Sequence, residues 1–196
     1  MEKNYFIFLY PIKEYFLSSF QKRANGFQLD FVERFNTMIE ARYRSKGFRV
    51  AWLLFDSNNG ESDEHDGVWG LETKKNDIFL SSGVSFREMT KSSKYANPIH
   101  VFSQISEKIE KMVLAGFHAY DCVDKLASYA YLNITTETMI DTDLTEITLM
   151  KYSFSEVPVV RTAFTFNDIY GSQPEYRVER MEKLIEEKPW IRQRPM

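Results

Sequence analysis

The sequence predicts an α/β fold, in which a mainly parallel sheet carries helices on both faces. Short apolar runs of strand length alternate along the chain with segments whose apolar residues recur at helical spacing. The apolar runs are continuous, which is typical of strands that are buried on both faces. Polar residues follow abruptly at most of their ends. Strands alternating with helices imply right-handed crossovers, and hence a three-layer, Rossmann-like arrangement.

The first three elements are well marked. The aromatic-rich run 5–10 predicts a buried strand that stops at Pro11. A helix follows, with Asp30 as its N-cap and Gly47 as its end. One face of this helix carries Phe31, Phe35, Met38, Ile39 and Tyr43. The run 48–55 then predicts a second buried strand.

The middle of the chain gives weaker signals. Residues 57–77 are rich in Ser, Asn, Gly, Asp and Glu, which predicts a long loop, with a small hairpin near Val68 and Trp69. Residues 77–81 predict a short third strand. The spacing of Ile105, Ile109 and Met112 predicts a helix after Pro98.

The last third predicts two further strands and two helices. Residues 113–115 form a strand that breaks at Gly116, and apolar residues between Val123 and Tyr131 follow at helical spacing. Residues 138–140 predict another strand, closed by the acidic segment from Asp141. We further expect an edge strand at 157–160, because Pro158 cannot donate to a ladder, and a charged helix at 175–187.

Length and composition indicate one globular domain. The 196 residues, of which 43% are hydrophobic and 27% charged, suit a domain over residues 1–170 with a helical extension over 171–196. The net charge of -3 argues against a nucleic-acid partner. A single cysteine suits a reducing compartment, and we expect a cytoplasmic protein without a signal peptide or membrane contact.

Ligands of open parallel sheets bind beyond the carboxyl ends of the strands. That rule selects candidate site residues without any motif, namely Pro11, Lys13, Asp56, Ser81, the segment from His118 to Cys122, Asp141 and Asp143.

Two acidic segments contain side chains that could bind a metal. Asp63–Asp66 includes a histidine but has no recognised ligand spacing, and such loops are usually only solvated. The segment from Asp141 to Glu146 could bind a metal or polar ligand, or cap a helix, which we favour. We therefore expect no metal site and no cofactor.

The segment 113–127 resembles the isochorismatase-like cysteine hydrolases. That family has an apolar strand, a glycine, five residues, and then Cys-Val opening a helix with small residues on its inner face. The matching positions are Gly116, Cys122, Val123, Ala127 and Ala130. The resemblance extends over roughly residues 5–145, since Met139-Ile140-Asp141 is similar to the family's next strand.

The resemblance implies a nucleophilic role for Cys122. Helix N-termini expose unpaired N–H groups and a partial positive charge, which favour the thiolate and can stabilise an oxyanion. The N–H groups of residues 119–122 would hold the oxyanion, and His118 or Asp56 would assist proton transfer. Substrate would contact Ala119, Tyr120, Asp121 and Asp141. Without the resemblance, a lone cysteine such as Cys122 is most often a small buried hydrophobe, and Asp121 can simply be a helix cap.

The sequence departs from the family pattern twice. The family has an aspartate after its first strand, where this chain has Tyr10-Pro11, and a lysine after its third strand, where no lysine follows Ser81 directly. Three functions remain open. One is a cysteine hydrolase of a small amide or ester with a divergent active site, and the second is a non-catalytic small-molecule-binding or assembly protein. The third is metal-dependent chemistry through the acidic strand ends. The resemblance and the C-terminal helix also suggest a homodimer.

Overall fold

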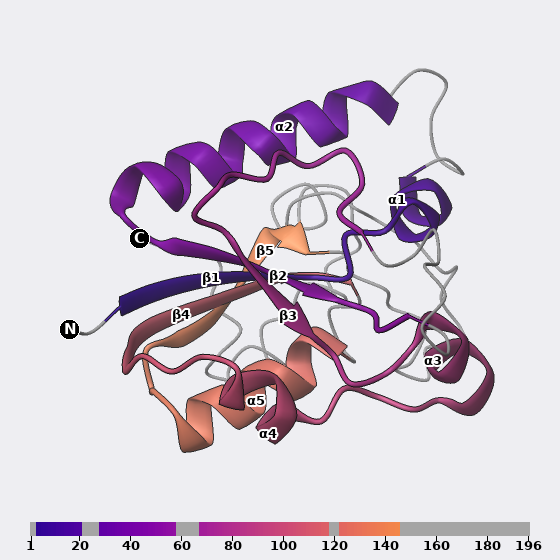
Figure 1. Cartoon of the computed structure of the whole chain (residues 1–196). Helices are drawn as coiled ribbons and strands as arrows, with labels where there is room; N and C mark the ends of the chain where they lie inside the picture. The colour runs from indigo at the N-terminus through magenta and orange to yellow at the C-terminus, as the bar shows by residue number, and fades with distance from the viewer. Residues whose placement is uncertain (1–2, 21–27, 58–66, 118–121, 146–196) are drawn as a thin grey trace, which may run out of the picture.

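The computed structural model of the protein describes residues 3–20, 28–57, 67–117 and 122–145. Within these residues, five strands form one sheet in the order β3-β2-β1-β4-β5, and every neighbouring pair is parallel (Figure 1). The strands are β1 (Lys3–Leu9), β2 (Arg49–Leu54), β3 (Ile78–Ser81), β4 (Ile109–Gly116) and β5 (Thr138–Thr145).

Helices cover both faces of this sheet. They are α1 (Lys13–Phe20), α2 (Gln28–Arg42), α3 (Phe86–Ser92), α4 (Pro98–Ser103) and α5 (Asp124–Asn133). Figure 1 shows α2 along one face and α4 with α5 on the other. The predicted fold class is therefore confirmed. None of the helices in the described residues is long and apolar enough to cross a membrane.

The core forms around β1, the central strand. Residues 5–9 are fully buried because helices cover both faces, which explains why this run is continuously apolar. The Phe6 ring stacks on Tyr43 at 4.0 Å, directly after the end of α2. Phe35 and Ile39 of α2 are also buried and Met38 is partly buried, which confirms the predicted apolar face at these positions and at Tyr43, whereas the Phe31 side chain is not among those described. Each such side chain contributes about 1.5–3 kcal/mol through burial.

Several predicted boundaries are wrong. The helix after Pro98 ends at Ser103, and Ile109 and Met112 belong to β4. A spacing of three fits either state over so short a run, and pairing with β1 decides it. No strand forms at Val68 or Trp69 within the described residues 67–77.

Of the two predicted helix-capping residues, Asp30 is wrong and Gly47 is confirmed. Helix α2 begins at Gln28, so Asp30 lies inside the helix and is not its N-cap. Gly47 does end the helical segment, after a short 3₁₀ turn at Arg44–Lys46, with a left-handed φ of 77°. Strand β5 also runs further than predicted, to Thr145, so Asp141 lies within the strand and not beyond it.

The predicted edge strand at 157–160, the helix at 175–187 and the extension over 171–196 lie outside the described residues. Their existence stays a prediction, and so does the domain boundary at residue 170.

Candidate functional site at the carboxyl edge of the sheet

The carboxyl ends of the strands place the candidate residues at one edge of the sheet. Tyr10 follows β1, Asp56 lies two positions after β2, Ser81 ends β3, and Cys122 lies beyond β4. Because all the strands are parallel, these ends meet on the same side of the molecule.

The ends of β1 and β4 approach each other closely at Gly116. Its φ is 110°, and a Cβ atom built there would lie 2.3 Å from the Leu9 carbonyl oxygen. Only glycine fits this position, because any side chain would overlap the backbone of β1. The predicted break at Gly116 thus has a steric cause, and it brings Phe117 beside the end of β1, where the Phe117 N–H donates to the Leu9 carbonyl oxygen at 3.2 Å.

Cys122 enters α5 through a single π-helical turn that it forms with Val123. The residue is only 3% exposed, and its Sγ lies 4.0 Å from Sδ of Met89, which belongs to α3. The nucleophilic role of Cys122 stays a prediction. In this conformation, however, the surrounding side chains cover the sulfur, and a substrate would have to displace them to reach it.

Tyr10 stands where the resemblance leads one to expect an aspartate. Its backbone is left-handed, with φ 53°, and its ring stacks on Phe55 at a centroid distance of 4.1 Å. The buried hydroxyl has no hydrogen-bond partner among the described residues. Burial raises the pKa of Tyr10 well above its ordinary 10.0, and the charge of a Cys122 thiolate nearby raises it further. Tyr10 therefore presents a neutral hydroxyl beside Cys122.

Asp56 is joined to the end of β3. Its Oδ1 accepts a hydrogen bond from the Ser81 hydroxyl at 2.7 Å, and Ser81 Oγ lies 3.1 Å from Nε2 of His100. The Ser81 hydroxyl has one proton, which it uses in the hydrogen bond to Asp56. Nε2 of His100 must therefore be the donor in its contact with Ser81 Oγ. The predicted role of Asp56 in proton transfer to Cys122 stays a prediction; these contacts fix the turn that follows β3.

Asp141 is fully buried inside β5. Nη1 of Arg42 donates to both of its carboxylate oxygens at 3.0 Å, and the Tyr43 hydroxyl donates to Oδ2 at 2.5 Å. These bonds join the end of α2 to β5. They explain why an acidic residue lies within a strand, and the predicted contact of Asp141 with a substrate stays a prediction.

His118, Ala119, Tyr120 and Asp121 lie outside the described residues, so their predicted roles are neither confirmed nor contradicted. The acidic loop Asp63–Asp66 also lies outside them. Within the described part of the chain, no group of three or more His, Cys, Asp or Glu side chains could hold a metal ion.

The sequence interpretation missed Met89, which contacts Cys122, and Tyr15, which bonds to Met89. The Tyr15 hydroxyl donates to Sδ of Met89 at 3.6 Å, and both side chains are buried. Tyr15 belongs to α1 and Met89 to α3, neither of which was predicted. A capping box, in which Ser85 and Glu88 bond each other's backbone, begins α3. The Ser85–Glu88 spacing was the available signal for that helix.

No protein-family model matches the sequence, and no curated protein matches it. Solved structures do match. An isochorismatase from Pseudomonas putida has a TM-score of 0.50 at 14% identity, over 96% of this chain and 85% of that chain. A putative isochorismatase hydrolase from Oleispira antarctica has a TM-score of 0.49 at 13% identity, over 74% of this chain and 75% of that one.

A third structure, N-carbamoylsarcosine amidase from Thermoplasma acidophilum, has a TM-score of 0.46 at 16% identity and covers 73% of this chain and 83% of its own. At these identities the likeness concerns the fold. The match to the Pseudomonas protein, over nearly the whole chain, supports the isochorismatase-like fold that segment 113–127 resembles.

Proposed function

We propose, starting from the isochorismatase-like fold of this chain, that the protein binds a small molecule and does not hydrolyse it through Cys122. The observation that carries this proposal is the packing of Cys122, which is 3% exposed and in contact with Met89. A nucleophile must reach the reacting carbon of its substrate, and this sulfur lies behind other side chains.

The residues at the two positions where this chain departs from the family pattern support the same proposal. The resemblance implies a carboxylate after β1 and an ammonium group after β3, and this chain has Tyr10 and Ser81–Ser82 there. A general base must be able to take a proton near neutral pH. With its pKa raised well above 10.0, Tyr10 is protonated at neutral pH and cannot take the proton of a thiol.

The unpartnered Tyr10 hydroxyl favours binding. A buried polar group without a hydrogen bond is destabilising, and such a group often marks a place that a ligand or water completes. A small molecule with a hydrogen-bond acceptor would satisfy this hydroxyl at the carboxyl edge of the sheet.

Alkylation of the intact protein with iodoacetamide at neutral pH, followed by mass mapping, tests the proposal. We expect Cys122 to react at least about tenfold more slowly than free cysteine, because the thiol is buried. The same protein in urea is the control and should react at the rate of free cysteine. A Cys122 that reacts faster in the folded protein than free cysteine would contradict the proposal.

A cysteine hydrolase of a small amide or ester is the second candidate. The observation in its favour is the turn at Cys122–Val123, which leads into α5 as the resemblance implies. Under this candidate, Cys122→Ser abolishes an esterase or amidase activity while the free energy of unfolding is unchanged. Under our proposal, the protein has no such activity to lose.

The cytoplasmic location and the homodimer that the sequence suggests belong to the same proposal. Size-exclusion chromatography with light scattering measures the oligomeric state directly. A mass of 23.2 kDa, that of one chain, would contradict the dimer.

A further inference from the structure

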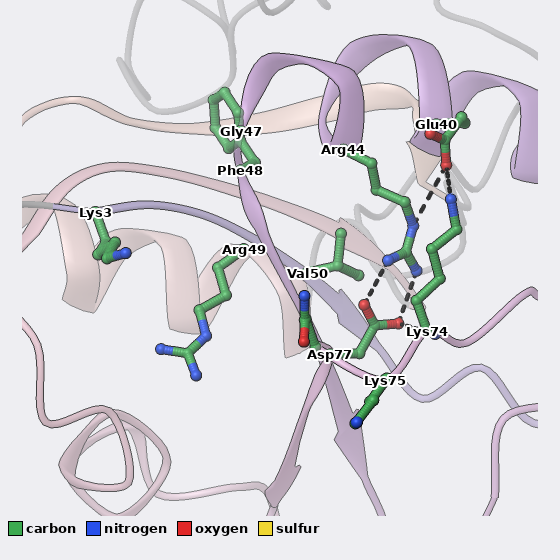
Figure 2. Close-up of a pocket in the computed structure, with 11 residues that line it drawn as sticks. Lys3, Glu40, Arg44, Gly47, Phe48, Arg49, Val50, Lys74, Lys75 and Asp77 are labelled. Atoms are coloured by element: carbon green, nitrogen blue, oxygen red, sulfur yellow. Dashed lines mark hydrogen bonds and ion pairs between the residues drawn. The ribbon is translucent and has the colours of Figure 1, made fainter.

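The amino edge of the sheet, opposite Cys122, contains a pocket of about 720 Å³. It lies between the start of β1, the start of β2, and the segment that leads into β3 (Figure 2). Its lining includes five basic side chains and two carboxylates: Lys3, Arg44, Arg49, Lys74 and Lys75, with Glu40 and Asp77. Basic groups therefore outnumber acidic ones here, although the whole chain has a charge of -3.

The pocket exists because β3 is short. Its four residues pair only with Ala51–Leu54, so Arg49 and Val50 at the start of β2 have no β3 partner. The chain before β3 instead turns away, held by the bond from the Lys74 N–H to Asp77 Oδ2 at 2.9 Å. This arrangement leaves the pocket open beside the first two residues of β2.

One wall of the pocket is fixed by buried charges. Arg44 Nη2 donates to Asp77 Oδ2 at 2.7 Å and Nη1 to Oδ1, and Trp52 Nε1 donates to Oδ2 at 2.8 Å. The Asp77 side chain is only 2% exposed. Figure 2 shows this pair and the contacts of Glu40 with Arg44 and Lys74.

The remaining basic groups are not neutralised to the same degree. Arg49 pairs with Glu107, outside the lining. Among the described residues, no carboxylate forms an ion pair with Lys3 or Lys75. In Figure 2, Lys3 and Arg49 are drawn on one side of the pocket and Lys75 on the other, near Asp77. An anion between them would meet positive charge from both sides.

We propose that this pocket binds a small molecule that carries phosphate groups. Its volume falls in the range of about 300–1,000 Å³ that small ligands occupy. Arginine binds phosphate oxygens through two parallel N–H groups, and lysine supplies point charges around them. The inference is independent of Cys122, since it concerns the other edge of the sheet.

Calorimetric titration of the full chain with inorganic pyrophosphate, at constant ionic strength, tests the proposal. We expect saturable binding that weakens as salt rises. Lys75→Ala should weaken it about tenfold, the effect of losing one charge-assisted contact. Lys91→Ala is the matched control, because Lys91 is an exposed lysine of α3 outside the lining, and it should change affinity less than about twofold.

Four outcomes would overturn the inference. The first is no saturable binding of pyrophosphate, and the second is equal weakening by Lys75→Ala and Lys91→Ala. The third is equal affinity for citrate, which would show that the pocket accepts any polyanion and does not select phosphate. Amide chemical-shift changes on adding pyrophosphate should cluster around residues 47–50 and 74–77; changes confined to the carboxyl edge would also refute it.

Discussion

The two edges of one sheet differ in what their side chains do. At the carboxyl edge, the Met89 sulfur contacts buried Cys122, the Tyr10 ring stacks on Phe55, and the Tyr10 hydroxyl is buried without a partner in the described residues. At the amino edge, arginines and lysines surround an open pocket, and the buried carboxylate of Asp77 fixes its wall. The comparison teaches that two edges of one parallel sheet can differ in both accessibility and charge.

Gly116→Ala should have the largest effect, at the carboxyl edge. The added Cβ would lie 2.3 Å from the Leu9 carbonyl oxygen and 2.7 Å from the Leu9 nitrogen, and backbone atoms cannot move aside. We expect a loss of about 4 kcal/mol or more in the free energy of unfolding, measured by urea denaturation.

Gly47→Ala, near the amino edge, is the matched control. Gly47 also has a positive φ, 77°, but nothing lies within 4 Å of its added Cβ. The loss there should be about 1–2 kcal/mol, from backbone strain alone. Equal losses in the two variants would show that the close approach of β1 and β4 is not what constrains Gly116.

Asp77→Asn should have the next largest effect, at the amino edge. It removes the buried carboxylate that binds the Arg44 guanidinium, which is only 11% exposed and keeps only the more distant, half-exposed Glu40, and we expect a loss of roughly 3 kcal/mol in the free energy of unfolding. Glu33→Gln, on the exposed side of α2, should change it little.

The Asp77 carboxylate should also make the free energy of unfolding depend on pH. Burial alone would raise the pKa of Asp77, but hydrogen bonds from Arg44, the Lys74 N–H and Trp52 hold it below its ordinary 3.8. The stabilisation is therefore present above about pH 4 and is lost as the pH falls through the lower folded pKa. Urea denaturation between pH 2 and 6 measures the free energy of unfolding. As the pH falls, it should decrease less steeply in Asp77→Asn than in the wild type.

Tyr10→Phe should have a smaller effect of opposite sign. Removing a buried hydroxyl without a partner relieves a desolvation penalty, so the free energy of unfolding should stay constant or rise by about 1 kcal/mol. Tyr43→Phe is the control, because that hydroxyl donates to Asp141, and its loss should lower stability by about 2 kcal/mol. A Tyr10→Phe variant as unstable as Tyr43→Phe would mean that the Tyr10 hydroxyl has a partner.

The smallest effect concerns Tyr5, near the amino edge. Burial, followed by the hydrogen bond to Glu107, raises the pKa of Tyr5 to about 12. Its contribution to stability is complete below pH 10 and is lost as the pH rises towards 12. In a spectrophotometric titration of tyrosine ionisation, the absorbance change that the wild type shows and Tyr5→Phe lacks should be centred near pH 12. Glu107→Gln should move it towards pH 10, whereas Glu33→Gln should not.

The sequence predicted the parallel sheet because its signal is repeated in every strand. The runs at 5–10, 48–55 and 138–140 are each apolar and bounded by polar or helical segments, so errors in single boundaries did not change the topology. Ile109 and Met112 were placed in a helix because a spacing of three is compatible with both states. Only pairing with β1, more than 100 positions away, decides between them.

The surroundings of Cys122 could not be predicted in the same way. Met89, which contacts Cys122, belongs to α3, and nothing in the local sequence states that it reaches Cys122. The pocket at the amino edge was missed for a related reason. It depends on the register between β2 and β3, and a strand pattern does not fix which residues of a longer strand remain unpaired.

The bonds from Arg42 and Tyr43 to Asp141 have a consequence for how the protein is made. The partners are separated by 99 and 98 positions, so α2 leaves the ribosome long before the carboxylate that anchors it. At ordinary rates of synthesis the delay is on the order of ten seconds. Until then the guanidinium and the phenol face solvent, and only the arrival of β5 closes this part of the molecule.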